Sequence, residues 1–314
     1  MSEPRISVII PVRNEAAKIE QCLQAIFSQA LKPYEVIVVD GHSTDGTVEN
    51  AKEFPVKVFY EDYYTRAGGC QVGVENAEGE YIAFTDADCI PDKAWLANLV
   101  REFDDGIAGV GGRYEDTGKD LWTRSFNLTL GTFASGAKSR SNEKSFTSNL
   151  SVCGANGLCR REDIQKVGGF SVRLSGAEDL ELGHRLSKIG KLLYVPDAVV
   201  LHNHSRGFRD SAKQMYRYGG WRRESRLWDL QAVVPLVIPL VLLSLIVTRW
   251  VFLGLLLLYL AIIIVMGMRF AVQESNLRYL VSIPVAYIVE HSCYIVGFWR
   301  ELIKPRKKGI PWKK

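Results

Sequence analysis

Two aspartates separated by one residue form the most informative chemical pattern in this sequence. Asp86 and Asp88 follow an apolar run at Tyr81–Phe84, and Asp40 ends a second apolar run. Carboxylate oxygens are the ligands that Mg²⁺ and Mn²⁺ favour, together with the phosphates of a substrate. The spacing therefore predicts a bound divalent cation at the end of a strand. A carboxylate pair in a solvated turn is the alternative.

These aspartates need a sheet that brings strand ends together. Short apolar runs, which we expect to be strands, lie at residues 6–12, 35–39, 56–60, 81–84 and 107–110. Helix-like segments lie between them at residues 15–29, 44–53, 66–77 and 93–103. The alternation predicts βαβ units, an α/β fold and a mostly parallel sheet. Such sheets bind ligands beyond the carboxyl ends of their strands, which is where the aspartates fall.

Missing motifs and the charge distribution exclude several classes of protein. The sequence contains neither a GxGxxG nor a GxxxxGK[ST] motif, which disfavours a dinucleotide dehydrogenase and a P-loop NTPase. The net charge of +4 combines −7 over residues 1–200, +4 over 201–230 and +7 over 231–314. Because the folded first part is acidic, a nucleic-acid binder is disfavoured. The six cysteines form no CxxC pair, so we interpret them as free thiols in a reducing compartment.

Three apolar stretches dominate the C-terminal part, at residues 232–248, 250–270 and 279–299. Each approaches the roughly 20 residues that span a bilayer, although the third carries Glu290 and His291. Basic residues both precede the first stretch and follow the third, and the positive-inside rule places both groups in the cytoplasm. Three full spans would separate them. Either one stretch is re-entrant or interfacial, or the rule is broken.

The sequence thus divides into three parts. We expect a catalytic domain over residues 1–205, a basic linker over 206–230 and a membrane region with a basic tail over 231–314. The linker mixes arginine and lysine with aromatic residues, which suits a helix lying on lipid headgroups; an ordinary domain-edge helix is the alternative. The expected location is the cell membrane, with several spans and with the catalytic domain in the cytoplasm.

At this point the sequence resembles the family-2 glycosyltransferases, which are inverting enzymes that use nucleotide sugars. The resemblance covers roughly residues 5–220, in the family's order and spacing. The matching segments are IIPVRNE at 9–15, VVDGHSTDGT at 38–47, DAD at 86–88, GAN at 154–156, VGGF at 167–170, EDLEL at 178–182 and VPDA at 195–198, followed by His202 and His204. It implies a Rossmann-like GT-A domain followed by an α-helical membrane region. The family often has two aspartates where Asp40-Gly41 stands, so base recognition would rest on Asp40 alone.

The resemblance also assigns roles to residues on the donor side. It implies that the donor nucleotide is held by Pro11, Val12, Asn14, Glu15, Asp40 and Asp86. Asp88 would ligate a Mn²⁺ or Mg²⁺ ion on the diphosphate. His202 would complete the metal site, with His204 as the alternative, and a surface His-x-His pair is the plainer interpretation.

On the acceptor side, Asp179 would be the general base, with Glu178 and Asn156 beside the acceptor. A strand over Cys153–Cys159 would lie next to it. Gln214 to Tyr218 loosely resembles the QxxRW element of polysaccharide synthases, which implies an acceptor-side Gln214 and a diphosphate contact for Arg217. Tyr216 or Tyr218 would stack on a sugar. The interfacial helix explains the same residues equally well.

The predicted function is transfer of one hexosyl or acetylhexosaminyl group from a nucleotide-diphospho-sugar to a hydroxyl of a lipid-linked acceptor. Glu178-Asp179 favours a hydroxyl, because a lipid phosphate is already anionic near neutral pH and needs little general base. Two alternatives remain, namely a polyprenyl-phosphate glycosyltransferase and a non-catalytic membrane subunit that binds nucleotide sugars.

Overall fold

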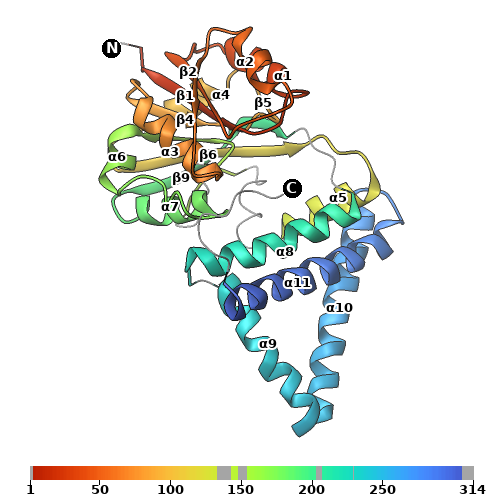
Figure 1. Cartoon of the computed structure of the whole chain (residues 1–314). Coiled ribbons are helices and arrows are strands. Elements are labelled where there is room, and N and C mark those ends of the chain that lie inside the picture. The colour runs from red at the N-terminus through yellow and green to blue at the C-terminus, as the bar shows by residue number, and fades with distance from the viewer. Residues whose placement is uncertain (1–2, 133–142, 148–153, 203–206, 229, 306–314) are drawn as a thin grey trace. The chain divides into compact units, whose positions relative to one another are not determined.

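The chain folds into two compact units in the computed structural model (Figure 1), which describes residues 3–132, 143–147, 154–202, 207–228 and 230–305. The first unit comprises Met1–Thr117 and Ser135–His204 as far as they are described, and the second comprises Gly118–Ala134 and Ser205–Arg306. The short segment Gly118–Ala134 therefore belongs with the C-terminal helices, although the sequence predicts one uninterrupted catalytic domain up to residue 205.

A single mixed sheet organises the described part of the first unit. Its strands are β1 (Ile6–Val12), β2 (Glu35–Asp40), β3 (Lys57–Tyr60), β4 (Tyr81–Phe84), β5 (Cys89–Pro91), β6 (Ile107–Asp116), β7 (Ser145–Thr147), β8 (Gly157–Arg160) and β9 (Lys191–His202). The order is β3-β2-β1-β4-β8-β6-β9-β5, with β7 also paired to β9. Strands β1 to β4, β6 and β9 share one direction, whereas β5, β7 and β8 oppose it. The predicted mostly parallel sheet is confirmed.

Helices cover both faces of this sheet and enclose two apolar cores. Helices α1, α2 and α4 pack on one face, and α3, α6 and α7 pack on the other. Their bounds are α1 (Ile19–Phe27), α2 (Thr47–Lys52), α3 (Arg66–Asn76), α4 (Trp95–Arg101), α6 (Arg161–Lys166) and α7 (Glu178–Leu186). The first core contains Trp95 and the second contains Tyr194, each with no exposed surface. Because both faces are covered, the strand ends are the accessible part of the sheet.

The first helix begins later than the sequence predicts. The segment 15–29 was expected to be helical throughout, yet α1 starts only at Ile19. Asn14 has a left-handed backbone, with φ of 55°, and the amide of Lys18 donates to the Glu15 carbonyl in a turn. The chain thus turns at the end of β1 before the helix starts. This turn leaves Asn14 and Glu15 at the carboxyl edge of the sheet.

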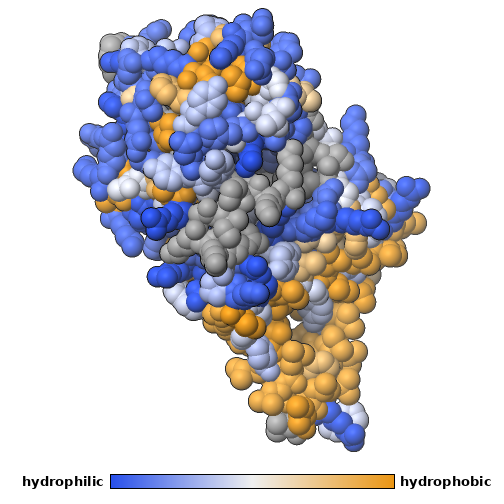
Figure 2. Space-filling model, viewed as in Figure 1, coloured by the Kyte–Doolittle hydropathy of each residue, from blue (hydrophilic) through white to orange (hydrophobic). Residues whose placement is uncertain are grey.

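The second unit is helical in its described residues. It contains α5 (Leu121–Leu130), α8 (Phe208–Ser225), α9 (Leu230–Val247), α10 (Arg249–Gln273) and α11 (Tyr279–Ile303). By length and composition, α10 and α11 are long and apolar enough to cross a membrane, and residues 231–246 of α9 form a shorter apolar helix. Figure 2 shows hydrophobic surface over α9 and α10, and their exposed side chains include Ile246 and Leu257.

The side chain of Asn156 connects neighbouring segments in the middle of the sheet through hydrogen bonds. Its side chain is 1% exposed, and its Oδ1 accepts a 2.8 Å hydrogen bond from the indole N–H of Trp95. Its Nδ2 donates to the carbonyls of Arg113 and Ala198 at 2.9 and 3.0 Å. The amide is therefore engaged on both its oxygen and its nitrogen within the core. This geometry argues against the predicted contact between Asn156 and an acceptor.

We expect Asn156→Ala to lower the free energy of unfolding by about 3 kcal/mol, because it leaves a buried indole N–H and two buried carbonyls without their partner. Urea denaturation of the detergent-solubilised protein, followed by tryptophan fluorescence, measures this loss. Asn98→Ala is the matched control, because Asn98 makes one exposed hydrogen bond to the Asp197 carbonyl. It should cost about 1 kcal/mol or less. Equal losses in the two variants would contradict the assignment.

Candidate active site

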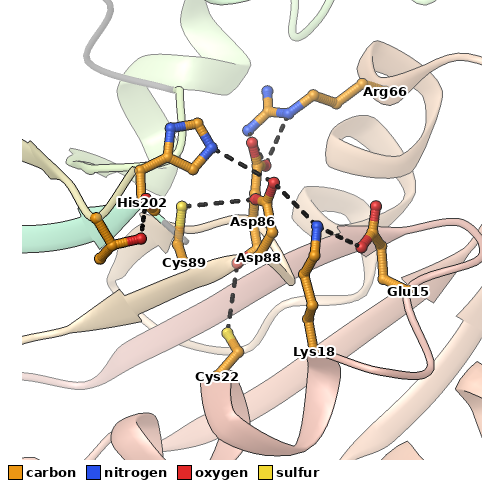
Figure 3. Close-up of polar contacts among 9 residues, drawn as sticks. Glu15, Lys18, Cys22, Arg66, Asp86, Asp88, Cys89 and His202 are labelled. Atoms are coloured by element: carbon orange, nitrogen blue, oxygen red, sulfur yellow. Dashed lines mark hydrogen bonds and ion pairs between the residues drawn. The ribbon is translucent and has the colours of Figure 1, made fainter. Parts of the chain in front are cut away.

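The two aspartates of the DAD motif lie in a turn at the carboxyl end of β4. The amide of Cys89 donates to the Asp86 carbonyl at 3.0 Å, which closes the turn. The side chains of Asp86 and Asp88 keep 30% and 21% of their surface exposed. Both carboxylates therefore remain accessible at the edge of the sheet where parallel strands bind ligands (Figure 3).

His202 reaches the same place from β9. Cys89 of β5 pairs with His202 in the antiparallel register, so the last residue of β9 lies beside the DAD turn. The Nε2 atom of His202 lies 3.4 Å from Oδ2 of Asp88. Candidate ligand atoms of Asp88, Cys89 and His202 all lie within 4.8 Å of one another. The structure thus brings together the two residues that the resemblance implies as metal ligands. His204 lies outside the described residues.

The donor types and their surroundings fit a divalent cation. A carboxylate and an imidazole suit Mn²⁺, and open positions remain for the oxygens of phosphate. The Cys89 thiol is buried, and burial raises its pKa well above the usual range. A thiolate is also a softer ligand than Mn²⁺ or Mg²⁺ favours, so Asp88 and His202 are the better candidates. The ammonium of Lys18 lies 3.9 Å from Oδ2 of Asp88, so this carboxylate already has one cationic neighbour.

Lys18 and Arg66 are charged residues of this site that the sequence analysis missed. Lys18 lies just before α1 and also pairs with Glu15, with 3.2 Å between Nζ and Oε2. Arg66 is the first residue of α3, directly after Thr65, whose hydroxyl accepts from the Gly68 amide and caps the helix. Their positions in the sequence could have identified them. Lys18 and Arg66 each lie at the start of a helix that follows a strand of the parallel sheet.

Arg66 holds two acidic side chains at once. Its Nε and Nη2 donate to Oδ1 of Asp86 at 2.9 and 2.7 Å, and its Nη1 donates to Oε1 of Glu178 at 2.9 Å. The exposed fractions of the Arg66 and Glu178 side chains are 19% and 5%. Charge-assisted hydrogen bonds of this length are strong because water does not compete for them. Arg66 therefore links the end of β4 to the start of α7.

The contact with Arg66 gives the neighbouring acidic residues Glu178 and Asp179 different surroundings. Burial raises the pKa of Glu178, although the Arg66 guanidinium opposes the rise. Asp179 is less buried, and its Oδ1 accepts from the Leu180 amide at 2.8 Å. The two carboxylates thus have different surroundings, because Glu178 is fixed to a cation in the interior while Asp179 keeps contact with solvent.

The loops after β1 and β2 are joined by a set of short hydrogen bonds. The carboxylate of Asp40 accepts from the amide and hydroxyl of Ser43 at 2.9 and 2.5 Å. The Ser43 hydroxyl accepts from the Asn14 amide at 2.8 Å, and the Asn14 side chain accepts from the Thr44 amide at 2.8 Å. Asp40 is 1% exposed. These contacts preorganise the loops, and a contact between Asp40 and a nucleoside stays a prediction.

The remaining candidate residues have simpler positions. Pro11 and Val12 are buried in β1, and the Val12 carbonyl accepts from the Gly41 amide at 2.8 Å. Gln214 and Arg217 lie on α8 in the other unit, so their contacts with donor or acceptor stay predictions. Residues 157–160 of the expected strand over Cys153–Cys159 form β8, and Cys153 lies outside the described residues.

Comparison with known proteins agrees with this arrangement. The model of the family described as glycosyl transferase family 2 matches residues 7–168. Glycosyltransferase AglE of Haloferax volcanii is 31% identical over 73% of this chain and 76% of its own length. A Methanococcus voltae protein is 27% identical over 95% of this chain and 97% of its own. Its name is dolichyl N-acetyl-alpha-D-glucosaminyl phosphate 3-beta-D-2,3-diacetamido-2,3-dideoxy-beta-D-glucuronosyltransferase.

A solved structure shares the fold. It is the mannosyltransferase PcManGT from Pyrobaculum calidifontis in complex with GDP-Man and Mn²⁺, with a TM-score of 0.69 and 20% sequence identity. The likeness covers 98% of this chain and 89% of that one. The predicted fold class, a GT-A domain followed by apolar helices, is confirmed.

We expect Asp88→Asn and His202→Gln each to weaken Mn²⁺ binding by more than about tenfold, because each removes one ligand from a small set. Electron paramagnetic resonance of free Mn²⁺ measures this, with the metal alone and with an added nucleoside diphosphate. His184→Gln changes an exposed histidine on α7 and should leave binding unchanged. Unaltered affinity in Asp88→Asn would show that the ion binds elsewhere.

We expect Arg66→Met to destabilise the protein by about 3–5 kcal/mol near neutral pH, because it leaves the buried Glu178 without its cation. The pKa of Glu178 then rises further in the folded state. Stability should fall as the pH rises from the ordinary pKa of a glutamate to this raised pKa, since the folded state binds the proton more tightly there. Urea denaturation between pH 4 and pH 8 tests the slope.

Two controls accompany the Arg66 experiment. The double variant Arg66→Met/Glu178→Gln removes the uncompensated charge, so it should regain stability and lose the added pH dependence. Arg101→Met breaks an exposed ion pair with Glu102 and should cost about 1 kcal/mol or less. A double variant as unstable as Arg66→Met alone would contradict the role of this pair.

Proposed function

The chain belongs to glycosyl transferase family 2, and on that premise we propose that it is a membrane-anchored, inverting, metal-dependent enzyme. It transfers one hexosyl or acetylhexosaminyl group from a nucleotide-diphospho-sugar to a hydroxyl of a lipid-linked acceptor. The proposal rests mainly on one observation, namely that the acidic side chains at the strand ends have three different surroundings. Asp88 and His202 lie 3.4 Å apart, Glu178 is held by Arg66, and Asp179 is only partly buried.

The donor side follows from the charges around Asp88. The diphosphate of a nucleotide sugar is anionic, and its departure concentrates negative charge on the leaving oxygen. A divalent cation held by Asp88 and His202 would neutralise that charge when bound. Lys18 and Arg66 add two protein cations close to the same carboxylates. The family assignment supports donor binding by the loops that Asn14, Ser43 and Asp40 join.

The acceptor side needs a base. A sugar hydroxyl loses its proton as it attacks the anomeric carbon, and a positioned carboxylate accepts that proton. We assign this role to Asp179, because Glu178 is buried and its carboxylate is already bound by Arg66. Direct displacement assisted by a single base inverts the configuration at the anomeric carbon, and no covalent glycosyl-enzyme intermediate is required.

The acceptor class is argued from the base and from the relatives. The Methanococcus voltae relative is named for transfer to position 3 of a sugar on dolichyl phosphate, which is a hydroxyl of a lipid-linked sugar. An acceptor of this kind needs a general base, whereas a polyprenyl phosphate does not. The hydrophobic surface of α9 and α10 supports attachment to the membrane where such lipids reside. Nucleotide sugars are made in the cytoplasm, so we place the catalytic unit on the cytoplasmic side.

We expect Asp179→Asn to reduce transfer by about 100- to 10,000-fold while donor affinity is unchanged, because the variant removes a proton acceptor and no donor contact. Glu181→Gln is the control, since Glu181 lies on the same helix and pairs with Arg185. The assay uses purified protein, Mn²⁺, a panel of nucleotide sugars and extracted lipid-linked acceptors. Mild acid then identifies the product, because a sugar phosphodiester is labile and a glycosidic bond resists.

Each outcome of this assay separates the candidate functions. Mild acid that releases the transferred sugar as part of a longer saccharide, in a product that depends on Asp179, supports the proposal. Release of the transferred sugar as a monosaccharide indicates a polyprenyl-phosphate glycosyltransferase. Transfer that is unaffected by Asp179→Asn removes the proposed base. If the protein binds the donor but neither transfers the sugar nor slowly hydrolyses the donor, it is a non-catalytic subunit.

A further inference from the structure

Helix α11 lies at the open end of a hairpin formed by α9 and α10 (Figure 1). The two hairpin helices are joined at Thr248, and their far ends contact different parts of α11. On the α9 side, the indole N–H of Trp299 donates to the Pro235 carbonyl at 2.9 Å. On the α10 side, a Cβ added to Gly267 would lie 3.1 Å from Pro284. Both contacts are remote from Thr248.

The rest of the hairpin is not covered by α11. If α11 were a third helix of a bundle, its second half would run beside residues 249–258 of α10. Most residues of that segment are exposed, including Trp250 at 71% and Leu257 at 66%. The second half of α11 instead contacts the first turns of α9. Helix α11 therefore crosses from one leg of the hairpin to the other.

The exposed face of α11 is mostly apolar, although it also carries Ser292. Val281, Ile288, Val296 and Ile303 are 68%, 41%, 58% and 76% exposed, and their spacing of seven or eight residues puts them on one face. A buried acidic residue, Glu290, lies on the opposite face. Glu290 is 1% exposed and accepts from the Thr129 hydroxyl of α5 at 2.7 Å. A mostly apolar face opposite polar contacts is typical of a helix that lies in a membrane surface.

The neighbour of α11 also argues against a third span. Helices α8 and α11 touch through their backbones, because a Cβ on Gly219 would lie 1.9 Å from the Tyr294 carbonyl oxygen. Helix α8 carries Arg217, Arg222 and Arg223. A helix in such close contact with α8 cannot lie at the bilayer centre without taking these arginines there, which is strongly unfavourable.

We propose that this chain enters the bilayer as a two-span hairpin, α9 and α10, while α8 and α11 lie along one membrane surface. The inference rests on the proposed membrane attachment and not on the proposed reaction. The 18 residues of α9 and 25 residues of α10 measure about 27 and 37 Å, close to the roughly 30 Å of hydrocarbon. Arg249 and Trp250, at the hairpin tip, then reach the opposite headgroups, where both residue types are favoured.

This topology explains why basic residues flank the apolar stretches on both ends, which three spans could not reconcile with the positive-inside rule. With two spans, the basic residues of α8 and the basic residues after α11 lie on the same side of the membrane. The hairpin tip contributes a single basic residue, Arg249, to the other side. The distribution agrees with the positive-inside rule, which three spans would break. It also identifies anionic headgroups as the chemical partner of α8 and of the C-terminal tail.

Labelling with a membrane-impermeant maleimide in sealed inverted vesicles tests the topology. Lys213→Cys on α8, Thr248→Cys at the tip and Lys304→Cys after α11 replace exposed residues. The unsubstituted chain measures the background, because its described cysteines are buried or partly buried. We expect Lys213→Cys and Lys304→Cys to react in intact vesicles, and Thr248→Cys to react only after the vesicles are permeabilised.

Other labelling patterns overturn the proposal. Lys304→Cys protected on the side opposite to Lys213→Cys would show three spans. Thr248→Cys reacting together with the other two would show a hairpin that does not cross. Extraction of the unsubstituted protein by alkaline carbonate would refute membrane attachment itself, whereas loss of transfer activity with the expected labelling would refute only the proposed reaction.

A matched pair of arginine substitutions tests the different depths of α10 and α11. Leu258 and Val296 are 59% and 58% exposed, so an arginine disturbs the folded protein equally little at either site. Leu258→Arg lies near the middle of a proposed span and should sharply reduce the protein recovered in membranes. Val296→Arg lies at the surface and should leave recovery unchanged. Equal recovery of both variants, or loss of Val296→Arg alone, would overturn the assignment.

Discussion

The guanidinium of Arg66 sets the arrangement of the acidic groups at the carboxyl edge of the sheet. Several carboxylates meet there, and without a cation among them they would repel one another and take up protons. Arg66 joins Asp86 on the turn after β4 to Glu178 at the start of α7, two points 92 residues apart in the chain. Because Glu178 is used in this way, we propose the neighbouring Asp179 as the carboxylate that acts on a substrate.

The sheet supplies the second condition for the site, since Asp88 and His202 belong to segments far apart in sequence. They meet because β9 runs in the same direction as β4 and pairs with β5 at its final residue. The two cations of the DAD turn come from opposite faces of the sheet, since Lys18, which pairs with Asp88, lies beside α1 and Arg66, which pairs with Asp86, lies on α3. The site thus depends on the whole first unit and not on one loop.

Sequence patterns predicted the parts of this protein that local physics controls. Continuous apolar runs identified β1 and β4 to the residue, because strands covered on both faces are apolar throughout. The DAD turn and His202 were found because strand ends and family motifs mark them. The structural role of Asn156 was not predicted, since a motif marks the residue while its amide bonds to groups from three other segments.

Charge pairing and helix placement could not be predicted in the same way. Arg66 and Lys18 carry no motif of their own, and their importance follows from which carboxylates they meet in three dimensions. The apolar stretch at α11 satisfied the criteria for a span because length and composition are local quantities. What distinguishes it is the set of surfaces it packs against, and those come from α5, α8, α9 and α10.

The crossing of α8 and α11 has a mechanical consequence. Most helix pairs are separated by a layer of side chains that can slide and repack, but Gly219 and Gly297 bring the two backbones into direct contact, and a Cβ at either position would overlap a carbonyl oxygen at 1.9 Å. No side chains lie between the two helices at this crossing, so α8 cannot rotate or slide along α11 without a backbone clash. The two helices therefore move together, and a displacement of one is transmitted to the other.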